Sequence, residues 1–131
     1  MSANRKVLQR WFDSFEAGDY ATTIDCMAED VEYHELPGWP GTREGAVYRG
    51  REEVVAWYTE LLGEWDGLVS EPGEITELDD GQVLVNETWR ARGRQSGVDV
   101  EMRAASVFTI RDGRIARVRY FRTRDEALGA A

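Results

Sequence analysis

The only histidine of the chain, His34, stands next to a glutamate, Glu35, in a short stretch of alternating apolar and polar residues. A neutral imidazole can move a proton near pH 7, and a carboxylate can do so once burial raises its pKa. Neighbouring side chains of a strand point to opposite faces, so only one of the two can reach an interior site unless a bulge intervenes. Glu35 is the preferred inward residue, and His34 is the second choice.

Few other residues offer nucleophilic or metal chemistry. The single cysteine, Cys26, excludes an internal disulfide and lies beside Met27 in a predicted helix. A buried, inert thiol is expected there rather than a nucleophile. One histidine without a spaced set of cysteines or aspartates makes no coordination set, so no metal site is predicted. We expect no cofactor.

The net charge of −9 conceals an uneven distribution of charge along the chain. Ten of the sixteen lysines and arginines lie between residues 90 and 124, against three acidic residues, so this stretch carries +7 and the remainder −16. These arginines can pair with acidic residues on an exposed sheet face, or they can form a basic patch for nucleic acid. Because an acidic chain repels polyanions and no aromatic-basic RNA motif is present, we expect paired arginines and no nucleic-acid partner.

The 131 residues suit a single domain, 1–131, and the 42% apolar content predicts a real hydrophobic core. No stretch has the unbroken apolar run of a membrane helix, and the N-terminus lacks the apolar core of a signal peptide. We therefore expect a cytoplasmic protein without a membrane partner.

The first 36 residues predict two helices and one strand. Gly18 ends the first helix, and Asp19 caps a short second helix that runs through Met27. The alternating stretch 31–36 predicts a strand. The apolar stripe of the first helix consists of Val7, Leu8, Trp11, Phe12 and Phe15.

Prolines and glycines break residues 37–49 into a loop that contains Trp39 and Tyr48. This loop is either a lid over a pocket or a connection anchored by its aromatic residues, and the sequence favours neither. Helical periodicity returns at residues 51–65, and Asp66-Gly67 is expected to close that helix.

Turn signals at Asp80-Gly81, Ser96-Gly97 and Asp112-Gly113 recur every sixteen residues, which predicts an antiparallel meander. The predicted strands are 68–78, 82–94, 98–110 and 114–122, and a short helix at 125–128 follows. Strands of about twelve residues span roughly 40 Å, so the sheet has to twist and bend. A bent sheet has a hollow side, which the helices would cover without filling.

Strand alternation predicts which side chains point into this hollow. They are Ala104, Ser106 and Phe108 from one strand and Val118, Tyr120 and Arg122 from the next. The hollow would then hold Glu35, Tyr120 and Arg122. Glu35 and Arg122 can form an ordinary buried ion pair, or Glu35 can act as a base with Tyr120 as the acid and Arg122 as an anchor for a carboxylate or enolate.

The predicted order of elements, α-α-β-α followed by a curved four-stranded meander, resembles the cone-shaped nuclear transport factor 2-like superfamily and, within it, the SnoaL-like group. The resemblance rests on residues 15–20 (FEAGDY), 27–35 (MAEDVEYHE), 48–52 (YRGRE) and 108–115 (FTIRDGRI). It implies an α+β fold, a cystatin-like roll that encloses a pocket. It implies no single activity, because one such cone hosts isomerases, dehydratases, cyclases, epoxide hydrolases and binders.

Two relatives within the superfamily indicate which chemistry the residues allow. In ketosteroid isomerase-like members the base lies at the end of the first strand, which places Glu35 in that role. Their two oxyanion donors match Trp11 and Ser106, neither of which is acidic, so steroid-type isomerisation is disfavoured while simple enolisation stays open. Limonene epoxide hydrolase-like members need an aspartate where this chain has Tyr120, which makes epoxide hydrolysis unfavourable.

The sequence therefore predicts a pocket protein for a small apolar or carbonyl-bearing molecule. It is either a cofactor-free acid-base enzyme of isomerase, cyclase or dehydratase type, or a non-catalytic binding or dimeric interaction module. The expected catalytic residues are Glu35, Tyr120 and His34. The expected ligand-binding residues are Trp11, Phe15, Tyr33, Trp39, Trp57, Ser106, Phe108, Val118 and Arg122. A homodimer is expected through the outer sheet face, at Val107, Thr109, Arg117 and Arg119.

Overall fold

The computed structural model describes residues 2–131. The helices are α1 (Ala3–Glu16), α2 (Tyr20–Asp25), α3 (Gly50–Glu64) and α4 (Arg124–Ala130). The strands are β1 (Met27–His34), β2 (Val47–Arg49), β3 (Trp65–Glu77), β4 (Gln82–Gly93), β5 (Asp99–Arg111) and β6 (Arg114–Phe121).

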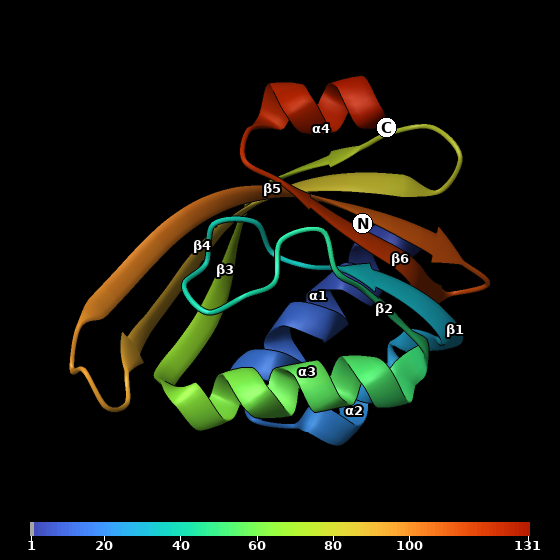
Figure 1. Ribbon diagram of the computed structural model, residues 1–131. Coiled ribbons are helices and arrows are strands. Elements are labelled where there is room, and N and C mark those ends of the chain that lie inside the picture. Colours follow the sequence, from blue (N-terminus) through green and yellow to red (C-terminus); the bar gives the residue numbers. More distant parts are fainter. Residues whose placement is uncertain (1) are drawn as a thin grey trace.

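The six strands form one mixed sheet in the order β2-β1-β6-β5-β4-β3. Strands β1 and β6 are parallel, and every other neighbouring pair is antiparallel. The sheet arches over α1, α2 and α3, which lie on its concave side, whereas α4 lies on the opposite face (Figure 1). The predicted α+β cone with a strongly curved meander is thus confirmed, although the sheet is not closed.

Three predicted boundaries are wrong, and pairing between distant segments explains each one. Strand β1 begins at Met27, because the backbone N–H of Ile115 donates to the Cys26 carbonyl and starts the pairing with β6. Residues 47–49, expected in a loop, pair with β1 as a short edge strand. Asp66-Gly67 does not follow a closed helix; it lies inside β3, where the register with β4 shifts.

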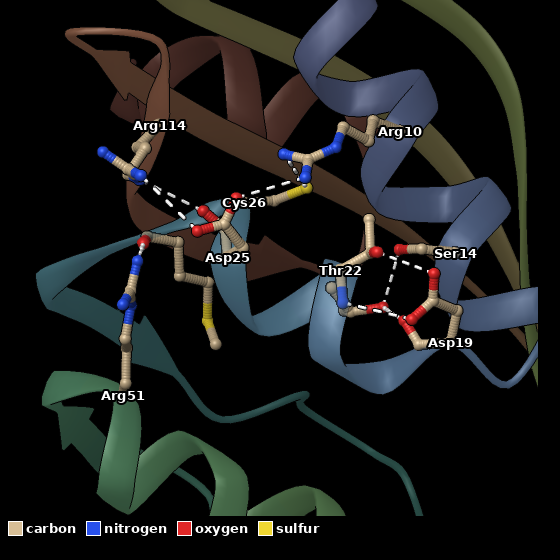
Figure 2. Close-up of polar contacts among 10 residues, drawn as sticks. Arg10, Ser14, Asp19, Thr22, Asp25, Cys26, Arg51 and Arg114 are labelled. Carbon is tan, nitrogen blue, oxygen red and sulfur yellow. Dashed lines mark hydrogen bonds and ion pairs between the residues drawn. The ribbon is translucent and has the colours of Figure 1, made fainter.

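Polar contacts join the first two helices to each other and fasten α2 and α3 to the sheet (Figure 2). Arg10 of α1 donates to the Asp25 carboxylate at 3.1 Å, and Arg114 of β6 donates to the Asp25 carbonyl at 3.1 Å. From α3, Arg51 donates to the Met27 carbonyl oxygen at 2.6 Å. These contacts hold the helices over the concave side. The predicted Asp19 cap is also present, because its side chain accepts from the backbone N–H of Thr22.

The main core lies between the concave face and the helices. Leu8, Trp11 and Phe12 of the predicted stripe are buried there, and the rings of Trp11 and Phe12 pack against Phe108. A second, smaller core on the outer face consists of Leu84, Ala105, Val107 and Ala127. Helix α4 therefore covers Val107, which was expected to be free on the outer face for pairing with a second copy.

No helix within residues 2–131 has the length and apolar character needed to cross a membrane.

Candidate functional site

A buried glutamate, Glu87, lies on the concave face of the sheet. Strand β4 alternates so that Val83, Val85, Glu87 and Trp89 all point inward, and Glu87 is only 3% exposed. Glu87 is not among the site residues predicted from the sequence. The signal was present, because Glu87 is in phase with the apolar residues of the predicted strand 82–94, and a carboxylate on the apolar side of a strand needs an explanation.

Two serine hydroxyls satisfy the Glu87 carboxylate. Ser70 of β3 donates to Oε1, and Ser106 of β5 donates to Oε2. Burial raises the pKa of Glu87 to about 7, although the two serine hydrogen bonds act in the opposite direction. A carboxyl group with this pKa is present in both protonation states near neutral pH, which is what general acid-base catalysis requires.

Three tyrosine hydroxyls form a chain beside Glu87. The Tyr33 hydroxyl lies 2.6 Å from that of Tyr58 on α3 and also contacts that of Tyr120 on β6. Burial raises the pKa of all three phenols, and the charge of Glu87 raises the pKa of Tyr58 and Tyr120 further. The phenols therefore stay neutral at physiological pH, so each can donate one proton and accept another.

An apolar hollow of about 190 Å³ lies between α1, α2 and α3. Two predicted ligand-binding residues, Trp11 and Phe15, line it together with Ile24 and Leu62. Tyr58 lines it as well and contacts Tyr33 through its hydroxyl. Tyr58 therefore connects the hollow to the polar interior.

The expected group of Glu35, Tyr120 and Arg122 is not assembled. Arg122 follows the end of β6, is exposed, and donates to Glu44 at 2.6 Å, so it forms no ion pair with Glu35. The Glu35 carboxylate is buried beside the 37–49 loop, where its Oε1 accepts from the backbone N–H of Arg43 at 2.7 Å. Burial raises the pKa of Glu35. The Tyr120 hydroxyl contacts that of Tyr33 instead, and the charge of Glu87 raises its pKa.

His34 points away from the concave face. Its ring lies 2.7 Å from the Glu32 carboxylate, which Arg49 and Arg117 also contact. A hydrogen bond from His34, followed by one from Arg49, lowers the pKa of Glu32 to about 2 against the effect of desolvation. Glu35 is thus the inward residue of the pair, and His34 belongs to a charged cluster on the outer face.

The other expected ligand-binding residues are buried on the concave side. Trp39 from the 37–49 loop is 2% exposed, and its ring packs 5.1 Å from that of Trp65 and 6.1 Å from that of Trp89. The loop is therefore anchored by its tryptophan. The remaining members of this group are Tyr33, Trp57, Ser106, Phe108 and Val118.

Comparison with known proteins agrees with this architecture. A solved NTF2-like protein of unknown function from Burkholderia pseudomallei K96243 superposes with a TM-score of 0.81 at 19% identity, covering 98% of this chain and 97% of its own. A putative polyketide cyclase from Sinorhizobium meliloti superposes with a TM-score of 0.67 at 25% identity, covering 92% of this chain and 100% of its own.

Sequence comparison gives the family directly. The uncharacterized protein Rv0034 of Mycobacterium tuberculosis (strain ATCC 25618 / H37Rv) is 32% identical over 120 residues, which cover 91% of this chain and 88% of that protein. The model of the SnoaL-like domain matches residues 8–118. With its cone-shaped fold and this match over most of its length, the chain belongs to the SnoaL-like domain family of the NTF2-like superfamily.

Proposed function

We propose that this protein binds a small, largely apolar carbonyl compound in the hollow between α1, α2 and α3 and moves a proton on it without a cofactor. The reaction would be of isomerase, cyclase or dehydratase type. One observation carries the proposal: Glu87 is a fully buried carboxyl group whose pKa is about 7, beside neutral phenols that lead to the hollow. Interior acids with shifted pKa values are typical of acid-base sites.

We infer the role of each residue from where it lies relative to the hollow. Tyr58 lines the hollow, and in this proposal its hydroxyl, which contacts that of Tyr33, donates a hydrogen bond to the carbonyl oxygen of the ligand. Tyr33 and Tyr120 continue the chain of hydroxyls into the interior. Glu87 is close enough for its charge to raise the pKa of Tyr120, and we infer that it stores or releases the proton. In this proposal Glu87 takes the role expected for Glu35. Tyr120 keeps a part in proton transfer, while His34 and Arg122 have none.

The family supports the class of ligand. The SnoaL-like fold is a small-molecule-binding fold, and the similar structure from Sinorhizobium meliloti is described as a putative polyketide cyclase. Polyketides carry carbonyl groups with acidic α-protons, which suits a carboxylate base with a raised pKa.

A second function, ligand binding without turnover, is favoured by the packing around Glu87. Tyr33, Trp89 and Phe108 are each at most 1% exposed, so side chains fill the interior next to the carboxylate. A ligand held in the hollow would then touch Tyr58 but would stay away from Glu87.

A hydrogen-exchange experiment tests the proposal and separates the two functions. The protein is incubated in D₂O with 2-tetralone and with a 1,3-diketone, and the loss of the α-proton signals is followed by NMR. We expect catalysed exchange that rises through pH 7 and falls by about 100-fold or more in Glu87→Gln. The exposed Glu16→Gln variant serves as the matched control and should exchange at the wild-type rate.

Each alternative outcome has a distinct meaning. Loss of exchange in Glu35→Gln but not in Glu87→Gln would return the role of base to Glu35. Ligand-induced shifts of the Trp11 and Tyr58 resonances without exchange would establish binding alone. Neither shifts nor exchange with either compound would overturn the proposal.

A further inference from the structure

The Glu35 carboxylate has one oxygen with a full set of partners and one with none. Its Oε1 accepts from the backbone N–H of Arg43 at 2.7 Å and from the Tyr48 hydroxyl at 3.3 Å. Its Oε2 is buried and makes no hydrogen bond of normal geometry within residues 2–131, although the side chain of Trp57 is close enough to lower the pKa of Glu35. The residue is 6% exposed. Buried carboxylate oxygens are nearly always hydrogen-bonded, so this oxygen indicates a donor that comes from outside the chain.

Glu35 lines a second hollow of about 280 Å³, on the side of α3 that faces the 37–49 loop. Glu60 and Glu64 line it as well, one turn apart on α3. Against these three carboxylates stands one guanidinium, that of Arg43, which is exposed at the rim. When all four groups are ionised the lining carries two net negative charges, which favours a cation.

An aromatic wall completes the hollow. The rings of Tyr48 and Trp57 both line it, with their centroids 5.8 Å apart and their planes inclined by 33°. The faces of such rings attract cations, and tryptophan does so most strongly. This combination of a carboxylate with aromatic faces suits an organic ammonium group better than a neutral or anionic molecule.

The spacing of the carboxylates indicates an organic cation rather than a metal ion. Within residues 2–131 no three acidic, histidine or cysteine side chains are grouped closely enough to hold a metal. The unpaired Oε2 of Glu35 requires an N–H or O–H donor, which a quaternary ammonium group lacks. A protonated primary or secondary amine supplies both the charge and the donor.

We propose that the hollow lined by Glu35, Tyr48, Trp57, Glu60 and Glu64 binds a small protonated amine, with an N–H group donating to Oε2 of Glu35 and the aromatic rings facing the rest of the molecule. This site is separate from the apolar hollow at Tyr58, and its existence does not depend on the function proposed above.

Three probes that share a benzyl group test the proposal by isothermal titration calorimetry at low salt. Benzylammonium carries charge and N–H donors, benzyltrimethylammonium carries charge alone, and benzyl alcohol carries a neutral donor. We expect benzylammonium to bind most tightly, the quaternary ion more weakly and the alcohol not measurably. NMR shifts of the Trp57 indole and the Tyr48 ring on titration establish that binding occurs in this hollow.

Variants then assign the contacts. Glu35→Gln removes the charge that receives the ammonium group and should weaken benzylammonium binding by about tenfold or more. Arg43→Gln removes the opposing charge at the rim and should tighten binding about two- to threefold. The exposed Glu16→Gln variant, which makes the same charge change elsewhere, should bind as the wild type does.

Circular dichroism verifies that each variant is folded. Should Glu35→Gln not fold, the double variant Glu60→Gln/Glu64→Gln on the surface of α3 is the substitute, and it should weaken binding severalfold. Equal binding of benzyl alcohol and benzylammonium, unchanged binding in these variants, or no binding of any probe would each overturn the proposal.

Discussion

Burial of Glu87 links the protonation of a single residue to the stability of the fold. The group titrates near pH 7 in the native chain and near 4.5 in a model peptide. Ionised Glu87 is therefore disfavoured by the folded state, in spite of the hydroxyls of Ser70 and Ser106. The contribution of Glu87 to the free energy of unfolding is most favourable below about pH 4.5, where the carboxyl group is protonated in both the folded and the unfolded chain. This contribution is lost as the pH rises through 7.

We expect the free energy of unfolding to fall between pH 5 and pH 8, with Glu87 contributing up to about 3 kcal/mol to the decrease. Urea unfolding at several pH values measures this decrease in the free energy of unfolding. Glu35, whose pKa is also raised, acts in the same direction, so the informative quantity is the difference between the wild type and Glu87→Gln. An equally steep decrease in the variant would show that Glu87 does not titrate in this range.

At the scale of elements, the turns between the long strands differ in how tightly they pack. Gly81, between β3 and β4, has φ 73°, and an added Cβ would lie 2.7 Å from the carbonyl oxygen of Ile110 at the end of β5. Gly97, between β4 and β5, has φ 69° but no atom within 4 Å of the same position. Both sites thus have a left-handed backbone that would strain any other residue, and they differ in the steric contact that an added Cβ would make.

Substitution of each glycine by alanine separates the cost of the left-handed backbone from the cost of the steric contact. Gly97→Ala should lose about 1 kcal/mol of stability from the left-handed backbone alone. Gly81→Ala should lose about 1 to 3 kcal/mol more, because the Ile110 backbone has to move. Thermal or urea unfolding of the two variants gives the comparison. Equal losses would mean that the β3–β4 turn yields without disturbing β5.

At the scale of the whole molecule, α4 divides the outer face of the sheet into a covered part and an open part. The covered part contains Val107, which packs with Ala127 of α4. The open part includes Arg117, which pairs with Glu32 at 2.9 Å. Arg119 lies at the edge of the covered part, because it donates to the Ala130 carbonyl of α4 at 3.2 Å, and its guanidinium lies 5.5 Å from the centre of the Phe121 ring. Burial lowers the pKa of Arg119, and the neighbouring Arg117 adds to this effect.

We expect a homodimer that uses the open part, at Thr109 and Arg117, with Arg119 at its edge and without Val107. Sedimentation equilibrium should then give twice the 14.9 kDa mass of one chain. Arg117→Glu places a second acid beside Glu32 and should shift the protein to the monomer. Lys6→Glu makes an equal charge change at an exposed residue of α1 and should leave the dimer intact. A wild-type mass of one chain at high concentration would contradict this prediction.

Local features of the sequence determined the parts of the fold that depend on local physics. The helical stripe of α1, the turns at Gly81, Gly97 and Gly113, and the inward direction of Tyr120 follow from periodicity and from backbone preference. Alternation required only that one of Glu35 and His34 face inward; the resemblance to ketosteroid isomerase-like members favoured Glu35, which is the buried one.

Only the tertiary structure decided the contacts that join distant segments. Glu87 acquires its raised pKa because the assembled core buries it, while the strand register brings the opposing hydrogen bonds of Ser70 and Ser106 to its carboxylate. Arg122 meets Glu44 instead of Glu35 because the loop folds back beside the end of β6. Alternation fixes the face on which a side chain lies, but not the neighbours it meets there. Those neighbours depend on register and loop path, which the packing of the whole core selects.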